Sequence, residues 1–515
     1  MRSRLALGLA VVLAACTGGG SSNTSSVPSL PWGNFRHDTM NSAASGAINN
    51  NKGNVTLMSD LQQGVTLSTP TIDKNGKLLI GTANGVMSFD AECVASTSPS
   101  ATPVAGCPRW TFTQCDLPCN TPPCPSAAVG RVSSSPTVTP GGDIIFGSEA
   151  TDDEPGALFV IREKGNTVDC AWFYRPDDAE PTFGIRSSAI GLIDSLDLSL
   201  LTVYFAADDG RLRALNSDGS LRWSFPTGTT AGPITNSPAL DSNSIVYAVA
   251  ADGVLSGVDF SGRPVPWKFG AGIPLPQTFQ PSLAVGTTVY AVGSAGALFG
   301  VNLSDGSQKW QFTAPTAIVG SPAFLIQTFD FMADNVLDTI IYVVDQQGTA
   351  YGVRDLDGSI IQVQRCTRDP NQSQDCRTDS CLPNGGTCTG NPKRCSISGL
   401  DCTQDSCVVD NSADNNHCAV TNGIVAVAGE AVAISGSPIV SGDLYTVIGT
   451  QDGRVCARTL DNLVPGHDFT PPTATWQDGN GCITVGDGSP IVSSPVIGQN
   501  QRIYVTTEAG LYLIK

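Results

Sequence analysis

The stretch "NSPALDSNSIVYAVAADGVLSGVDFSGRPVPWKFG", residues 236–270, reads as four short strands. Pro238 opens the first strand, Tyr247 lies in the second, Asp252-Gly253 turns into the third and Trp267 marks the fourth. Asp-Gly tolerates the positive φ of a type I′ hairpin, and a proline suits the start of an edge strand. A unit of four such strands cannot bury its own faces, so it must stack on copies of itself.

The same pattern occurs eight times along the chain. The opening positions of the eight copies are Pro70, Pro136, Ala189, Pro238, Pro281, Pro322, Pro438 and Pro495. A propeller blade of four strands takes about 40 to 50 residues, so the longer intervals must contain insertions. We therefore predict an all-β fold, an eight-bladed β-propeller of four-stranded antiparallel blades over residues 32–515, as a monomer.

Tryptophans recur at the position expected for the fourth strand. They are Trp110, Trp172, Trp223, Trp267, Trp310 and Trp476, and Trp32 stands apart near the start. A single tryptophan can be ordinary core, but six at one repeat position indicate a rule for docking one blade on the next. A buried indole beside such a seam contributes about 3 kcal/mol or more, judged by truncation.

The last copy stops after three strands, because the chain ends at Lys515. An open eighth blade would leave an unpaired sheet edge, which promotes aggregation. The segment "NVTLMSDL", Asn54 to Leu61, precedes Pro70 by about the interval that separates a fourth strand from the next blade elsewhere. We expect it to supply the missing strand and close the ring, so that deletion of residues 48–62 unfolds or oligomerises the protein.

The first residues indicate export. Arg2 and Arg4 precede an apolar stretch from Leu5 to Leu13, which is too short to span a bilayer because that takes about 20 residues. Residues 1–15 resemble a bacterial lipoprotein signal, with Cys16 as the acylated residue; a plain cleaved secretory signal is the alternative. Thr17 after the cysteine favours the outer membrane, on its periplasmic or surface side.

Residues 16–31 are rich in Gly and Ser and are expected to form a flexible tether. Charged residues make up 14% of the chain and the net charge is -18, with no long helical pattern and no basic patch. Nucleic acid is therefore excluded as a partner, because binding phosphates requires clustered cations. Envelope proteins, and the membrane through the lipid, remain the expected partners.

The remaining sixteen of the 17 cysteines fall into even groups, which in an exported chain indicate disulfides. Cys93 and Cys107 flank one hairpin loop, and Cys456 and Cys482 lie in blade seven. A set of four spans blades one and two: Cys115, Cys119, Cys124 and Cys170. A set of eight lies in the largest insertion: Cys366, Cys376, Cys381, Cys388, Cys395, Cys402, Cys407 and Cys418. Zinc is the alternative, but paired C-x-x-C knuckles are missing.

The insertion, residues 366–418, is predicted between blades six and seven. It is polar and cannot hold a core, so it should depend on its disulfides. It is either a recognition module or a tolerated surface excursion. In "DFMADNVLD" oxygen ligands at short spacing make a candidate structural Ca²⁺ site: Asp330, Asp334, Asn335 and Asp338. The alternative is a solvated acidic turn. The three histidines, His37, His417 and His467, form no catalytic arrangement that spacing supports.

Two segments identify a family resemblance: "ALNSDGSLRWSF" (214–225) and "GVNLSDGSQKWQF" (300–312). They resemble the PQQ-like propeller repeat, with its Ala-x-Asp-x-x-Gly-x-x-x-Trp docking pattern. "WGNFRHDTMNSAASG" (32–46) is similar to a segment that often precedes such propellers. The resemblance covers residues 32–365 and 420–515, and it implies the fold more strongly than the function.

The resemblance implies three classes of activity. Quinoprotein dehydrogenases hold PQQ with adjacent cysteines and a Ca²⁺ ligand set, and here no two cysteines are adjacent. A second branch, the outer-membrane β-barrel assembly lipoproteins, is matched by the lipid signal, the tether and the blade number, but not by the Cys-rich insertions. The third class is surface or periplasmic recognition of a ligand or glycan. We predict a lipid-anchored scaffold with no catalytic residues and no cofactor, because fold alone does not confer chemistry.

Overall fold

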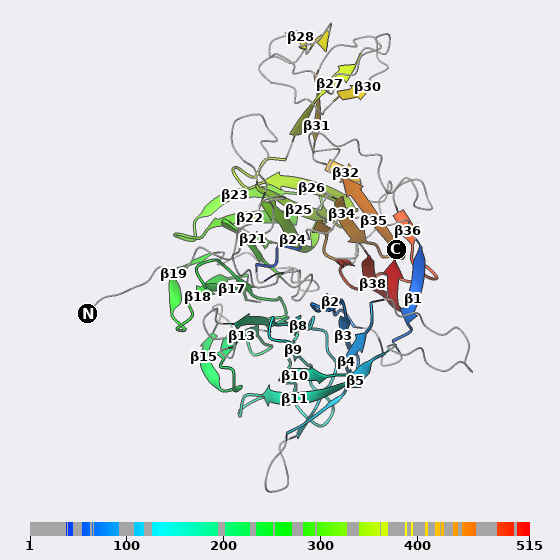
Figure 1. Cartoon of the computed structure of the whole chain (residues 1–515). Helices are drawn as coiled ribbons and strands as arrows, with labels where there is room; N and C mark the ends of the chain where they lie inside the picture. The colour runs from blue at the N-terminus through cyan, green and yellow to red at the C-terminus, as the bar shows by residue number, and fades with distance from the viewer. Residues whose placement is uncertain are drawn as a thin grey trace, which may run out of the picture.

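The computed structural model shows eight four-stranded antiparallel sheets arranged in a ring (Figure 1). The predicted fold class is therefore confirmed. The structure describes residues 38, 40–44, 54–61, 64, 66–91, 108–117, 126–193, 201–226, 233–250, 253–269, 282–293, 296–326, 339–360, 362–368, 387–388, 393–394, 407–409, 418–422, 424–426, 436–440, 445–459, 482–498 and 502–515.

Blades one to four each run from an inner to an outer strand in chain order. Blade one is β2 (Thr71–Ile72), β3 (Leu78–Thr82), β4 (Gly85–Phe89) and β5 (Trp110–Phe112). Blade two is β8 (Thr137–Val138), β9 (Asp143–Gly147), β10 (Leu158–Lys164) and β11 (Thr167–Tyr174). Blade three is β12 (Ile190–Ile193), β13 (Leu201–Ala206), β14 (Arg211–Leu215) and β15 (Leu221–Pro226). Blade four is β16 (Ala239–Leu240), β17 (Val246–Val249), β18 (Leu255–Val258) and β19 (Pro264–Phe269).

The other four blades include two that take their fourth strand from elsewhere in the chain. Blade five is β20 (Ala284–Val285), β21 (Thr288–Val292), β22 (Ala297–Asn302) and β23 (Gln308–Thr313). Blade six is β24 (Ile318–Ile326), β25 (Thr339–Asp345), β26 (Thr349–Arg354) and β32 (Ile424–Ala426). Blade seven is β33 (Ile439–Val440), β34 (Tyr445–Gly449), β35 (Arg454–Thr459) and β36 (Cys482–Thr484). Blade eight is β37 (Val496–Ile497), β38 (Ile503–Thr507), β39 (Gly510–Ile514) and β1 (Val55–Ser59).

The N-terminal strand β1 closes the ring, as predicted. It pairs antiparallel with β39, with Val55 opposite Ile514 and Thr56 opposite Leu513. The ladder continues through Asn54 and Lys515, whose amides and carbonyls exchange hydrogen bonds of 2.8 and 3.0 Å. The last residue of the chain is thus paired with the first strand.

Two expectations about the repeats are wrong. The insertion lies inside blade six, between its third strand β26 and its fourth strand β32, because the chain leaves the blade before completing it. Blade five carries Leu283 at the position where most blades have proline and blade three has Ala189, since Leu283 precedes β20 as Pro238 precedes β16. Pro281, which the sequence pattern placed there, lies outside the described residues.

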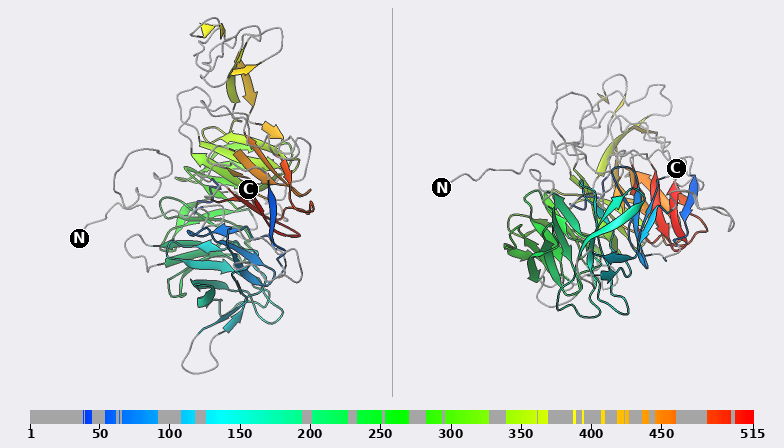
Figure 2. Two further views of the ribbon diagram at one scale, coloured as in Figure 1. Left: turned by 45° about the vertical axis from the view of Figure 1, so that its right-hand side comes forward. Right: turned by 60° about the horizontal axis from the view of Figure 1, so that its bottom comes forward.

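Two smaller elements stand away from the ring (Figures 1 and 2). The hairpin of β6 (Gln114–Asp116) and β7 (Ser126–Ala128) follows blade one. Five strands belong to the insertion: β27 (Gln362–Arg368), β28 (Thr387–Cys388), β29 (Lys393–Arg394), β30 (Cys407–Val409) and β31 (Cys418–Asn422). They form a three-stranded and a two-stranded sheet that project outward next to blade six.

The core lies between neighbouring blades. Second-strand tyrosines are among the largest fully buried side chains: Tyr204, Tyr247, Tyr290, Tyr342 and Tyr504. In blades four and five the tyrosine stacks on the tryptophan of the same blade. The ring centroids are 5.8 Å apart for Tyr247 and Trp267 and 6.2 Å apart for Tyr290 and Trp310. Burial raises the pKa of Tyr204 to about 12, so its phenol stays neutral.

A relay of seven hydrogen bonds links all eight blades at their inner ends. A serine, or a threonine in blade one, lies two residues before the first strand of each blade except blade six, where Ser321 lies within β24. In blades one to seven the amide of this residue donates to the equivalent hydroxyl of the next blade at 2.8 to 3.1 Å. The donor and acceptor pairs are Thr69–Ser135, Ser135–Ser188, Ser188–Ser237, Ser237–Ser282, Ser282–Ser321, Ser321–Ser437 and Ser437–Ser494. These buried amides are satisfied without any contribution from strand pairing.

Candidate functional site

The ring has two faces that differ in what they present. Because antiparallel strands alternate in direction, the first-to-second and third-to-fourth turns of every blade lie on one face, called face A here. The second-to-third turns and the connections between blades lie on the opposite face, called face B.

A tryptophan clamp joins each of blades two to five to the next. The indole lies in the fourth strand and donates to a carbonyl in the turn that follows the third strand of the next blade. The pairs are Trp172 with Ser217 (3.0 Å), Trp223 with Phe260 (3.1 Å), Trp267 with Leu303 (3.1 Å) and Trp310 with Asp355 (2.6 Å). The ring lies against a positive-φ glycine of the same turn, so closely that an added Cβ would come within 3.0 Å. These glycines are Gly219, Gly262, Gly306 and Gly358.

The clamp turns are held in shape by acidic residues. The hydroxyl and the amide of Ser220 donate to one carboxylate oxygen of Asp218, at 2.6 and 2.9 Å, and Ser307 does the same for Asp305. The hydroxyl hydrogen bond lowers the pKa of each carboxyl, so these exposed groups are ionised at neutral pH. Face A therefore carries fixed negative charges at its rim.

The seam between blades one and two uses different chemistry. Trp110 donates to a carboxylate oxygen of Glu163 at 2.7 Å, not to a turn carbonyl. Lys77 and Arg109 contact the same carboxylate at 2.6 and 3.1 Å. The turn glycine, Gly165, has open space around it, because no indole packs there. This seam is held by ion pairs where the others are held by aromatic packing.

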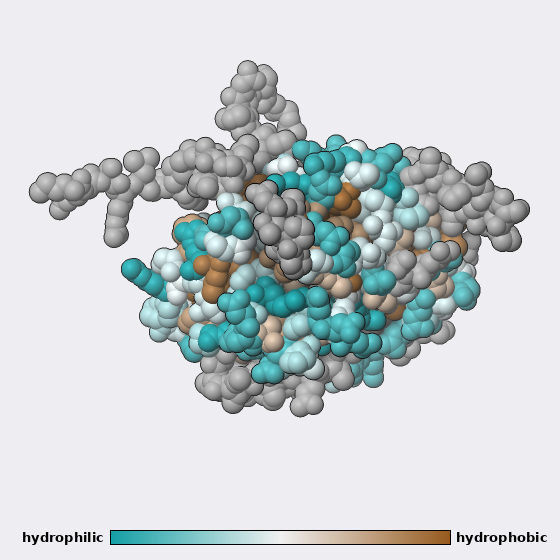
Figure 3. Space-filling view, turned by 90° about the horizontal axis from the view of Figure 1, so that it is seen from below, coloured by the Kyte–Doolittle hydropathy of each residue, from teal (hydrophilic) through white to brown (hydrophobic). Residues whose placement is uncertain are grey.

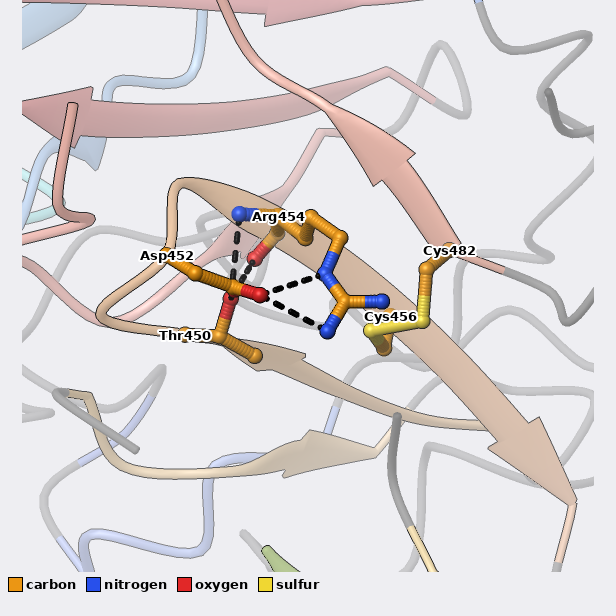
Figure 4. Close-up of a disulfide and its surroundings, with 5 residues drawn as sticks. All are labelled: Thr450, Asp452, Arg454, Cys456 and Cys482. Carbon is orange, nitrogen blue, oxygen red and sulfur yellow. Dashed lines mark hydrogen bonds and ion pairs between the residues drawn. A yellow bond between two sulfur atoms is a disulfide. The ribbon is translucent and has the colours of Figure 1, made fainter. Parts of the chain in front are cut away.

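The disulfide of Cys115 with Cys170 adds to this seam, since it ties β6 to the outer strand of blade two. A second disulfide, Cys456 with Cys482, joins directly opposite residues of β35 and β36 in blade seven (Figure 4). Both lie in the cysteine groups named from the sequence. Beside the second one, Arg454 pairs with Asp452 at 2.7 Å in the turn before β35 (Figure 4).

An N-terminal collar, Met40 to Ala44, lines the inner edges of blades five, six and seven. The carbonyls of Met40, Ser42 and Ala43 accept amides from β20, β24 and β33, each at 2.9 Å. The buried Asn41 side chain donates to the carbonyls of Pro238 and Leu283 at 3.1 and 2.9 Å. Apart from the resemblance of residues 32–46, no sequence pattern indicates this contact.

Face B carries a charge network across blades two and three. Arg186 reaches Glu149 at 3.1 Å and Asp208 at 3.2 Å, and Arg131 lies 3.5 Å from Glu149. Burial raises the pKa of Asp208 to about 6, with Arg186 opposing the shift and the neighbouring acids adding to it. Each carboxylate of the network is paired with an arginine, so the network stabilises the contact between blades two and three.

Large apolar side chains are exposed at only a few of the described positions, and Figure 3 shows small apolar areas in a mainly hydrophilic surface. Three of them lie at the face A ends of blades three, four and six: Leu221 (47% exposed), Phe260 (41%) and Leu356 (50%). The fourth, Leu67 (65%), lies in the connection into blade one, on face B. The guanidinium of Arg222 stacks 3.5 Å above the Phe260 ring.

Several residues singled out from the sequence lie outside the described residues. They are Cys16, Trp32, His37, Cys93, Cys107, Cys119, Cys124, Asp330, Asp334, Asn335, Asp338, Cys376, Cys381, Cys395, Cys402, His417, His467 and Trp476. Among the residues that are described, no group of three or more metal-binding side chains comes together. No helix long and apolar enough to cross a membrane occurs in the described part of the chain.

Comparison with known proteins gives a partial match. Residues 200–359 match the family model described as outer membrane protein assembly factor BamB. Among solved structures, BamB from Moraxella catarrhalis is 12% identical with a TM-score of 0.44, and the alignment covers 90% of this chain and 97% of that one. The computationally designed Ika8 protein is 10% identical with a TM-score of 0.47, covering 89% and 99%. No curated protein matches the sequence. The chain is thus an eight-bladed β-propeller whose residues 200–359 are similar to this family of PQQ-like repeats.

Proposed function

We propose that this propeller is a non-catalytic, lipid-anchored scaffold that binds proteins at the cell envelope, in the assembly of outer-membrane proteins. The observation that carries the proposal is the match of residues 200–359 to a family described as an assembly factor. That stretch runs from β13 in blade three to the turn after β26 in blade six. It contains the most regular tryptophan clamps of the ring.

The clamps make the ring a rigid platform. Their indoles and turn glycines are committed to blade packing, and the carboxylates of the clamp turns are committed to local hydrogen bonds. A preformed surface binds a partner with little loss of conformational entropy, because few side chains or loops must be ordered. Rigidity of this kind suits a scaffold.

The docking rim that we assign to this function is Leu221, Phe260 and Leu356 on face A. Each of these exposed side chains lies in or next to a clamp turn within the matched stretch. Ionised carboxylates such as Asp218 lie in the same turns. The complementary partner therefore presents apolar side chains flanked by lysine or arginine.

Affinity capture from detergent-solubilised membranes tests the proposal. Barrel-assembly components should co-purify with the tagged full chain, and the triple variant Leu221→Ser, Phe260→Ser, Leu356→Ser should reduce their recovery about tenfold or more, as expected for loss of interface hot spots. Leu67→Ser is the matched control, because it removes a still more exposed leucine, 65% exposed, from face B. Failure to recover these components with the unaltered chain, or equal recovery with the triple variant, would contradict the proposal.

The lipid anchor on Cys16 has its own test. Metabolic labelling with a fatty acid should mark the chain, and Cys16→Ala should abolish the label and move the protein from the membrane to the soluble fraction. An unlabelled chain that still fractionates with membranes would overturn the anchoring.

A further inference from the structure

A cavity of about 280 Å³ opens on face A between blades one and two. Its floor is apolar and consists of Leu79, Val138 and Ile144, whose side chains are at most 4% exposed. Its rim is charged and includes Lys74, Lys77 and Arg162. The volume is close to the lower limit of about 300 Å³ for ligand pockets, so it suits a small ligand.

The open space follows from the local sequence. The first-to-second turn of blade two contains Gly141 and Gly142, which put no side chain over the floor. Gly142 has φ of +93°, and an added Cβ there would meet nothing within 4 Å. In this seam the indole of Trp110 is held by Glu163, so no turn glycine is covered by the ring as it is in the clamps.

The rim has an excess of positive charge, in contrast to the chain as a whole. Three cations line the cavity against two carboxylates, Asp73 and Glu163. Both carboxylates already have partners in the protein. Glu163 forms ion pairs with Lys77 and Arg109. Asp73 accepts hydrogen bonds from the backbone amides of Asn75 and Lys77, each at 2.8 Å.

The two other lining cations differ in how far they are neutralised. Arg162 is paired with Asp143. Lys74, by contrast, makes no hydrogen bond or ion pair with any residue in the part of the chain that the structure describes. Its ammonium group is therefore available to a bound anion at the mouth of the cavity.

We propose that this cavity binds a small amphipathic monoanion, a carboxylate carrying a short apolar chain. The carboxylate pairs with Lys74 at the rim, and the chain lies on Leu79, Val138 and Ile144. A purely polar anion would leave the floor uncovered, and an apolar cation would place its charge against Lys74. The site is separate from the docking rim, which lies on blades three to six.

Isothermal titration of the full-length protein with straight-chain carboxylates tests this site. Hexanoate should bind saturably at one site per chain, and affinity should rise about three- to fourfold per CH₂ from propionate to hexanoate, as burial of a methylene predicts. Hexylammonium and sulfate should not bind saturably. Absence of saturable hexanoate binding, or equal binding of hexylammonium, would overturn the proposal.

Charge reversal at the rim locates the site. Lys74→Glu should weaken hexanoate binding about tenfold or more, since it replaces an attraction by a repulsion of similar size. Lys268→Glu, an exposed lysine on the outer strand of blade four, is the matched control and should leave binding unchanged. If both variants bind hexanoate as the unaltered protein does, the carboxylate lies elsewhere and the assignment is wrong.

Discussion

Replacing Gly306 by alanine should destabilise the ring much more than replacing Gly165, although both glycines occupy third-to-fourth turns with positive φ. Gly306 has φ of +69° and lies under the indole of Trp267, while Gly165 has φ of +66° and open space around it. The two positions therefore share the backbone strain and differ in the clamp. The difference in stability between the two variants therefore measures the effect of the tryptophan packed on the turn.

The magnitudes follow from the geometry. An alanine in the left-handed region costs about 1 to 2 kcal/mol at either site. At Gly306 the new Cβ would also meet Cε3 of Trp267 at 2.3 Å, and the indole is held from moving by its hydrogen bond to Leu303 and its stacking on Tyr247. Overpacking of this kind adds about 1 to 3 kcal/mol. We expect Gly306→Ala to cost about 2 kcal/mol more than Gly165→Ala.

Urea unfolding followed by circular dichroism measures the difference, with the slope of the transition checked for constancy. The double variant Gly306→Ala, Trp267→Ala should recover part of the loss, because removing the indole removes the clash. Equal costs for the two glycine variants, or no interaction energy between Gly306 and Trp267, would refute the clamp as a rigid contact.

Three further results are expected. Asp208→Asn should flatten the dependence of stability on pH between about pH 4 and pH 6. The pKa of Asp208 is raised to about 6 in the folded protein, so the folded protein holds this proton more tightly than the unfolded chain and loses stability as the pH rises through that window. Urea unfolding midpoints measured across the range would detect the difference between the variant and the unaltered protein. Changing both Cys456 and Cys482 to serine should cost about 3.5 kcal/mol by the loop-entropy estimate for their sequence separation of 26, and an unchanged midpoint would show the disulfide to be dispensable. Asn41→Ala should lower stability by about 2 kcal/mol through two lost hydrogen bonds, whereas an Asn41 variant as stable as the parent would mean that the collar contributes nothing.

The blade number and the closing strand could be predicted because they depend on local signals. Each blade repeats its strand start, its Gly turn and its tryptophan within one short stretch, and the truncated last copy reveals the missing strand. The error at Pro281 has the same origin, since a proline two residues early imitates the start of a blade. The insertion was predicted after blade six, not inside it, because it separates the fourth strand β32 from the rest of its sheet.

The remaining features depend on contacts between distant segments. The collar brings Asn41 against Pro238 and Leu283, and no periodicity links residues so far apart. The serine relay uses a residue that the Ser-Pro pattern contains, but its hydrogen bonds exist only once neighbouring blades are in place. The cavity between blades one and two forms where turns of the two blades meet. In the sequence, its glycines, Gly141 and Gly142, indicate only an ordinary turn.

Hydrogen exchange at the amides of Gly510–Ile514 tests ring closure most directly, because these residues form the strand that pairs with Val55–Ser59. In the full-length protein, we predict slow exchange for the amides that donate to β1, and fast exchange for the same amides after deletion of residues 48–62, while the exchange of blade four stays unchanged. Amides of Gly510–Ile514 that exchange equally slowly in both proteins would contradict a ring latched by its N-terminal strand.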